Sequence, residues 1–287
     1  MTLPGPDQRD LAPASALRRG ADWLLERTRR GHVRLTRGAS SIGLDLRRGQ
    51  IESLRVGARE VLSSPLAMSI GRIVSPGRGG AEPTNRRERR AQRDRTLRVS
   101  RYRVLESADG IEVVLELRSR IADATVTLRA DGRDGILVHA LVRPRREPVL
   151  VGFRAGLDSA FDRVQWARRA PAERPDSPER VGWHRRTLAQ LRSAVSRDVE
   201  RAGVEHVVLA DGDVQVRVER EGETPFRFAF PGSGESSRRD ELRAPETTLA
   251  VHLEAPRGAA AFEPREYSAR FRLTWGSARG TSGPLPA

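Results

Sequence analysis

The sequence predicts an all-β fold, an antiparallel sandwich built from many short strands. About fifteen segments combine β-branched or apolar residues with the two-residue alternation of a half-buried strand. Turn-forming Gly, Pro, Asp and Ser residues separate these segments every 8–12 residues or so, and one segment alone has helical spacing. Each half-buried sheet needs a second layer over its apolar face, which favours two packed sheets over a single open one.

One N-terminal helix is expected over Ser15–Arg30, SALRRGADWLLERTRR. Ser15 is a suitable N-cap, and arginines precede Gly31 as they often do at the end of a helix. The apolar residues near helical spacing are Leu17, Ala21, Leu24 and Leu25. Such a helix lies on its own domain or docks on a partner.

Strands are expected from His32 onward. Asp109-Gly110 and the stretch Asp131–Gly135, DGRDG, have the composition of hairpin turns. The predicted strands occupy residues 33–38, 41–49, 51–57, 60–70, 96–104, 111–117, 124–130, 136–142, 149–157, 163–167, 203–210, 213–220, 225–230, 247–255 and 267–275.

Two long loops interrupt this rhythm. Pro76–Arg95 has almost no apolar residue, and Ala167–Thr187 is rich in Pro and Arg and contains Trp183 and His184. Long loops in a sandwich are usually functional or disordered. The chain is therefore divided into an arm with the helix (1–31), a sandwich domain (32–276) and a disordered tail (277–287).

The composition and the hydropathy pattern restrict the compartment in which the protein is expected and the metal or disulfide sites that it can have. The chain has 287 residues and no cysteine, so it has neither disulfides nor thiolate metal ligands. Its first residues lack the positive start and apolar core of a signal peptide, and no apolar run approaches the ~20 residues that span a bilayer. A cytoplasmic protein without membrane contact is expected.

The net charge of +14 raises the possibility of nucleic-acid binding. All 52 basic residues are arginine, and they are spread among 38 acidic residues rather than clustered. The most basic run, Arg86–Arg95, has no aromatic residue for base stacking and includes two acidic residues. Solvated surface charge is favoured over a nucleic-acid interface.

No motif for a nucleophile elbow, a zinc protease, a phosphate loop, a dinucleotide fold or an EF-hand is present. The five histidines are isolated in sequence, so neither a metal nor a cofactor is expected. Among them, His184 stands out because it follows Trp183 in the second long loop. Acidic candidates such as Glu173 and Asp176 lack a context that would mark a raised pKa.

The stretch Val149–Asp176, VLVGFRAGLDSAFDRVQWARRAPAERPD, resembles the C-terminal domain of family 2 β-galactosidases. That family has a strand of the form R-x-G-L, then F-D-x-V-x-W, then a loop close to Y-G-R-G-P-x-E-N-Y-P-D-R. The matching residues here are Phe161, Asp162, Val164, Trp166, Arg169, Pro171, Glu173, Pro175 and Asp176.

Other segments follow in the order of that family. Gln50–Leu62, QIESLRVGAREVL, resembles its opening; Glu82–Asn85, EPTN, resembles A-P-T-D-N-D; and PFRFAF resembles P-F-x-F-S-A. Arg265–Leu273, REYSARFRL, resembles its closing motif. The resemblance covers roughly 32–275 and implies a galactose-mutarotase-like supersandwich, the fold class of that domain, which agrees with the strand count.

The chain also departs from the family pattern. Arg168 and Ala170 replace loop glycines, one residue is missing before Pro175, and Gly222 lies near the position of an aromatic ring that contacts galactose in the family. The family's catalytic carboxylates belong to a barrel domain that has no counterpart in this chain. No catalytic residue can therefore be transferred, and we expect no autonomous hydrolase activity.

Four functions follow as hypotheses. The first is a non-catalytic, small-chain-like subunit that completes a separate barrel-containing glycoside hydrolase chain. The second is a free carbohydrate-binding module for galactosides, whose candidate residues are Arg169, Glu173, Trp183 and His184. The others are a mutarotase-like enzyme that uses His184 as acid or base, and a nucleic-acid binder.

Overall fold

Every regular element in the described part of the chain is a β-strand. The computed structural model describes residues 18–20, 22–71, 97–120, 122–133, 135–145, 150–158, 160–168, 182–187, 204–221, 226–229, 247–253 and 266–277. Within these ranges all strand pairs are antiparallel, and no helix is long and apolar enough to cross a membrane. The predicted antiparallel, all-β fold class is confirmed.

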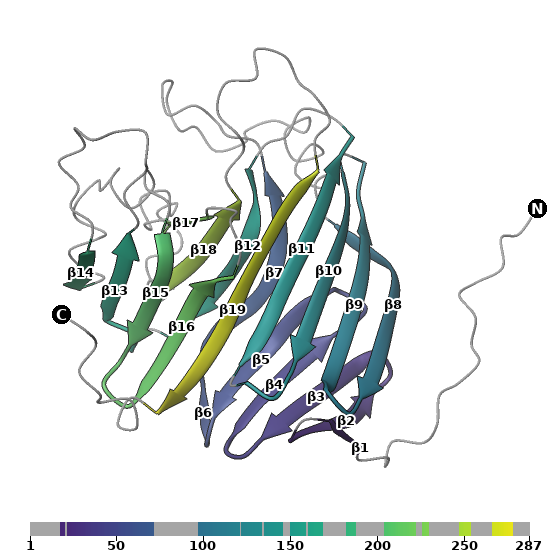
Figure 1. Cartoon of the computed structure of the whole chain (residues 1–287), viewed down its shortest axis with the longest axis horizontal. Coiled ribbons are helices and arrows are strands. Elements are labelled where there is room, and N and C mark those ends of the chain that lie inside the picture. Colours follow the sequence, from purple (N-terminus) through teal and green to yellow (C-terminus); the bar gives the residue numbers. More distant parts are fainter. Residues whose placement is uncertain are drawn as a thin grey trace, which may run out of the picture.

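The strands form two layers, which Figure 1 shows one behind the other. The front layer has the order β8-β9-β10-β11-β19-β16-β15-β13-β14. Its strands are β8 (Arg98–Ser107), β9 (Gly110–Arg118), β10 (Ala122–Ala130), β11 (Ile136–Pro144), β13 (Arg163–Arg168), β14 (Gly182–Thr187), β15 (Val204–Ala210), β16 (Val214–Arg220) and β19 (Tyr267–Ser277).

The back layer has the order β1-β2-β3-β4-β5-β7-β12-β18-β17, with β6 beside β5. A single pair, Val204 and Phe226, joins β15 of the front layer to β17 of the back layer. The strands of the back layer are β1 (Arg18–Gly20), β2 (Trp23–Arg29), β3 (His32–Arg37), β4 (Ser40–Asp45), β5 (Gln50–Val56), β6 (Arg59–Glu60), β7 (Leu62–Gly71), β12 (Leu150–Leu157), β17 (Phe226–Ala229) and β18 (Thr247–Leu253).

The core lies between the two layers. Alternate residues of each strand are buried, as in β10, where Ala124, Val126 and Leu128 point inward and the residues between them are more exposed. Two aromatic contacts bridge the layers. Phe271 of β19 meets Phe153 of β12 edge-to-face at 5.4 Å between ring centroids, and Trp275 of β19 lies 6.4 Å from Trp23 of β2.

The predicted N-terminal helix is wrong, because Arg18–Gly20 and Trp23–Arg29 are the strands β1 and β2. Asp22, between them, has a positive φ of 66°, which a helix does not permit. Trp23 and Leu25 are buried with the two-residue period of a strand. Pairing with β3 also makes β2 an integral part of the sheet rather than part of a separate arm.

Candidate functional site

The structure describes two of the four predicted sugar-binding residues. Arg169 and Glu173 lie outside the described residues. Trp183 and His184 lie in strand β14, opposite Ala167 and Trp166 of β13, so this end of the predicted loop is a strand instead. Its residues lack clear apolar periodicity, but strand pairing uses backbone groups that every non-proline residue has.

Several of the residues that carry the β-galactosidase resemblance are core residues, and Arg169, Pro171, Glu173, Pro175 and Asp176 lie outside the described part of the chain. Phe161, just before β13, and Val164 and Trp166 within it are buried, whereas Asp162 is exposed. In the first motif, Ile51 is buried in β5. These four buried positions therefore contribute to the packing of the sandwich.

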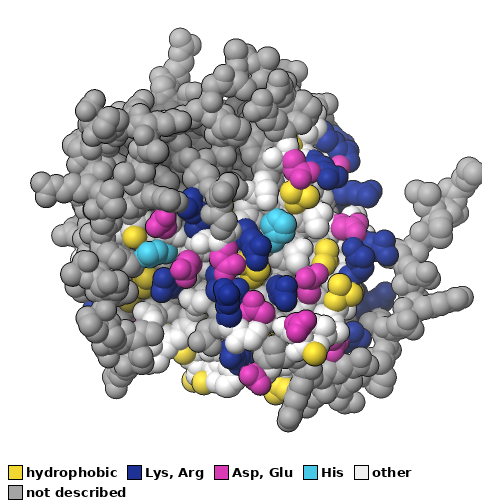
Figure 2. Space-filling model, viewed as in Figure 1, with side chains coloured by type: hydrophobic (Ala, Val, Ile, Leu, Met, Phe, Trp, Pro, Cys, Tyr) yellow, Lys and Arg dark blue, Asp and Glu magenta, His cyan; other side chains and the backbone are white. Residues whose placement is uncertain are grey.

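Polar side chains instead collect on the outer face of the front layer, the face turned away from the back layer. Figure 2 shows arginines and acidic residues interspersed there, together with histidines. Strand register aligns one row across this face: His206 is opposite Glu219, which is opposite Arg272, which is opposite Leu137. Residues directly opposite in neighbouring strands have Cβ atoms about 5 Å apart, so this row brings charged groups together.

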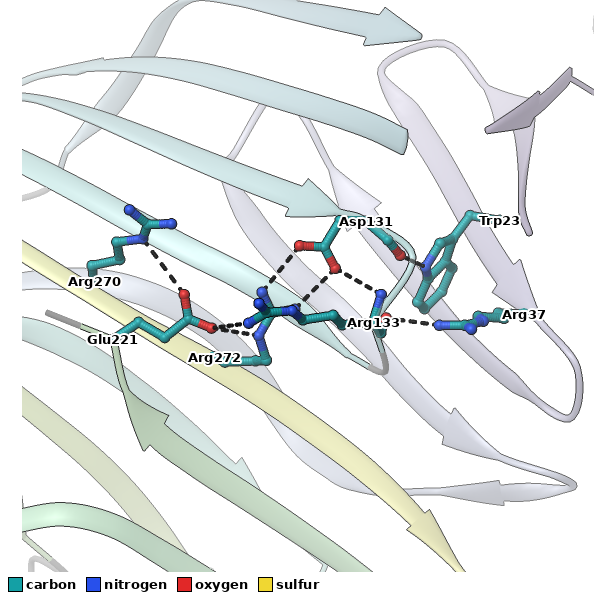
Figure 3. A network of polar contacts seen from close by, with 7 residues as sticks. All are labelled: Trp23, Arg37, Asp131, Arg133, Glu221, Arg270 and Arg272. Carbon is teal, nitrogen blue, oxygen red and sulfur yellow. Dashed lines mark hydrogen bonds and ion pairs between the residues drawn. The ribbon is translucent and has the colours of Figure 1, made fainter. Parts of the chain in front are cut away.

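Arg272 connects two carboxylates on this face. Its side chain is 7% exposed, and it donates to both carboxylate oxygens of Asp131, over 3.1 Å and 3.0 Å. Its Nε also donates to Oε1 of Glu221 over 2.6 Å. Two further arginines, Arg133 and Arg270, lie 3.8 Å and 3.6 Å from Glu221 (Figure 3). Three guanidinium groups and two carboxylates thus form one network.

The turn that carries Asp131 also contacts the back layer (Figure 3). The Trp23 indole Nε1 donates to the carbonyl oxygen of Asp131 over 2.9 Å, and Arg37 donates to the carbonyl oxygen of Arg133 over 2.7 Å. Gly135 in the same turn has φ +87°, and a Cβ there would lie 2.2 Å from the carbonyl oxygen of Leu273. The network therefore holds β10, β16 and β19 together and ties them to β2 and β3.

The surroundings shift two pKa values in this network. Burial raises the pKa of the Asp131 carboxyl, but hydrogen bonds from Arg272 and the Arg133 amide and the nearby guanidinium charges outweigh it, so the pKa lies below its ordinary value. Burial lowers the pKa of Arg272, but Asp131 and Glu221 reverse this and raise it. Asp131 is consequently a fixed negative charge at neutral pH, and its oxygens accept rather than donate hydrogen bonds.

His206, in the same row, has a shifted pKa as well. Burial lowers the pKa of its imidazole, and the Arg217 charge lowers it further, with an opposing effect of Glu219 and Glu205. The imidazole is therefore neutral at pH 7, and its Nε2 is buried. The sequence placed His206 in a strand, but nothing in its local pattern marked it as part of a polar row.

This shift predicts a pH dependence of stability. Because the pKa of His206 is lower in the folded chain, the unfolded chain binds its proton first as the pH falls below about 6.5. The wild type should thus lose stability between about pH 7 and pH 5, and His206→Gln should lose less over the same range. Urea unfolding at several pH values measures both; parallel curves would contradict the shift.

No protein-family model and no curated protein matches the sequence. Solved structures do resemble the fold. The galactose 1-epimerase of Lactobacillus acidophilus has 11% identity and a TM-score of 0.48, over 90% of this chain and 97% of that one. A heparan sulfate lyase mutant of Pedobacter heparinus has 9% identity and a TM-score of 0.40, over 94% of this chain and 38% of that one.

The structure of the Slr1438 protein from Synechocystis sp. matches over 93% of this chain and 99% of its own, with 10% identity and a TM-score of 0.44. At these identities and TM-scores the similarity assigns no activity to this chain. The architecture rests on the strand pairing of the chain itself, and the resemblance to family 2 β-galactosidases stays a prediction.

Proposed function

We propose that this chain is a non-catalytic subunit that completes or stabilises a separate, barrel-containing glycoside hydrolase chain of the β-galactosidase type. Two lines of support agree. The motifs that resemble the small-chain domain of that family fall in order on β5, β13 and β19, where they build the sandwich. The outer face of that sandwich, in turn, carries charges that are fixed in position by Arg272.

The state of Asp131 is the observation that carries this proposal. A glycosidase acid must hold a proton at the working pH, which requires a raised carboxyl pKa. Arg272 instead lowers the pKa of Asp131 and binds Glu221 at the same time. Both carboxylates form ion pairs with Arg272, and such pairs fix the positions of the strands and turn that carry them. A rigid surface of this kind supports catalysis in a partner by positioning substrate or loops, without a reacting group of its own.

Affinity purification of the full-length tagged chain from its native cells tests this proposal. We expect a larger chain to co-purify, and the eluate to hydrolyse a chromogenic β-galactoside. An eluate from cells with the tag alone is the control. If the chain elutes by itself without activity, or with a partner that hydrolyses no glycoside, the proposal is wrong.

A free carbohydrate-binding module is the second candidate, and the strand register favours it. Ala167 is opposite both His206 and Trp183, so Trp183 occupies the end of the same row as His206, Glu219 and Arg272. Ligand sites often combine aromatic residues with a few polar groups, and this register places Trp183 in line with such a set. Titration of the isolated chain with galactose and lactose by calorimetry separates the two candidates. Saturable binding that Trp183→Ala abolishes favours the module, and no binding favours the subunit.

A further inference from the structure

A second group of ionisable residues lies in the back layer, away from the outer face of the front layer. His32 begins β3, Asp45 ends β4 and Glu52 lies near the start of β5, so three consecutive strands bring them together. One ligand atom from each lies within 4.8 Å of the others. The sequence did not reveal this group, because its histidine has no ligand at a close, motif-like spacing.

The strand geometry directs these side chains to one place. His32 and Asp45 are opposite each other in the β3–β4 pair, and neither takes the inward direction of the core residues Val33 and Leu44 beside them. In the β4–β5 pair the register shifts, so Glu52 is an extra residue with no opposite residue in β4. Such a bulge reorients a side chain, and here it brings Glu52 to His32.

The distances and the donor atoms suit a metal ion. Nδ1 of His32 lies 3.2 Å from Oε1 of Glu52. Two ligand atoms bound at about 2 Å to a tetrahedral ion are separated by roughly 3.3 Å, so His32 and Glu52 would need little movement to share an ion. The side chains of His32 and Asp45 are 12% and 6% exposed and that of Glu52 is 32% exposed, so the group is partly buried and water can still reach a bound ion. Imidazole nitrogen and carboxylate oxygen are both ligand atoms for Zn²⁺ and related ions.

Two exposed arginines lie beside the group and leave its ligand atoms accessible to an ion. Arg29 lies 3.4 Å from Nδ1 of His32 and 3.7 Å from Glu52, but its side chain is 68% exposed and can swing into solvent. Arg48 lies 3.7 Å from Oδ2 of Asp45 and is 76% exposed. Oδ1 of Asp45 accepts the amides of the next turn, which fixes the carboxylate and leaves Oδ2 for a ligand.

We propose that His32, Asp45 and Glu52 bind a divalent transition-metal ion such as Zn²⁺, with water completing the coordination. The ion would join β3, β4 and β5 at the end of the back layer and raise the stability of the folded chain, since it binds the folded state alone. This inference does not depend on the proposed function.

Calorimetric titration of the full, metal-stripped chain with Zn²⁺ tests the site. We expect one saturable site per chain, weakened about tenfold or more in both His32→Gln and Glu52→Gln. Asp45 is left intact, because its loss would also break the turn. The matched control is His139→Gln, which removes an exposed histidine of the front layer and should bind as the wild type does.

A thermal melt of each variant with and without Zn²⁺ gives a second readout. The ion should raise the melting temperature of the wild type and of His139→Gln, and raise that of the other two variants less. An absence of saturable binding to the wild type would overturn the proposal. So would unchanged affinity in His32→Gln and Glu52→Gln, because the ion would then bind elsewhere.

Discussion

Replacing Arg272 with alanine is expected to lower the free energy of unfolding by about 3 kcal/mol, the range for breaking a buried ion pair. The substitution leaves Asp131 and Glu221 without their shared donor, and both are only about one-fifth exposed, at 19% and 22%. It also removes the hydrogen bonds that connect β19 to the turn after β10. Urea unfolding followed by circular dichroism measures the change.

The matched control is Arg270→Ala, in the same strand. Arg270 also contacts Glu221, but at 3.6 Å and with a side chain that is 54% exposed, so we expect a loss of less than about 1 kcal/mol. Equal losses of unfolding free energy in the two variants would show that Arg272 contributes no more to stability than an exposed surface ion pair does.

Replacing Trp23 with alanine is expected to destabilise the chain by about 3–5 kcal/mol, the range for deleting a large buried aromatic side chain. Trp23 is 1% exposed, packs against Trp275 and donates to the carbonyl oxygen of Asp131. Its removal creates a cavity between the layers and leaves that carbonyl without its indole donor.

Thr28→Ala serves as the control for Trp23→Ala, because Thr28 is an exposed residue of the same strand. A change within about 0.5 kcal/mol is expected there. If Trp23→Ala were equally mild, β2 would be only loosely attached to the sandwich and not part of its core.

The strands could be predicted from the sequence because burial on one face leaves a two-residue period. Ile111–Leu117 and Ala124–Ala130, predicted from their alternation, lie within β9 and β10. The helix prediction failed where two periods overlap. Leu24 and Leu25 can be assigned to a helical stripe, but Trp23 and Leu25 are the buried pair of a strand, and only pairing with β3 decides between them.

The charged groups could not be predicted, because they depend on contacts between distant parts of the chain. Asp131 and Arg272 are 141 positions apart, and each looks like an ordinary turn or strand residue in its local sequence. Glu52 approaches His32 through a bulge, which shifts register by one residue and is not visible as a motif. Of the two candidate sugar-binding residues that the structure describes, Trp183 is in register with the polar row and His184 is not.

The β-galactosidase activity of the purified partner chain, measured alone and with increasing amounts of this chain, tests the proposed accessory role most directly. We expect activity to rise with added chain and to saturate when the two are equimolar, and we expect the unstable Arg272→Ala variant to restore less. Partner activity that is the same with and without this chain would contradict the proposed role.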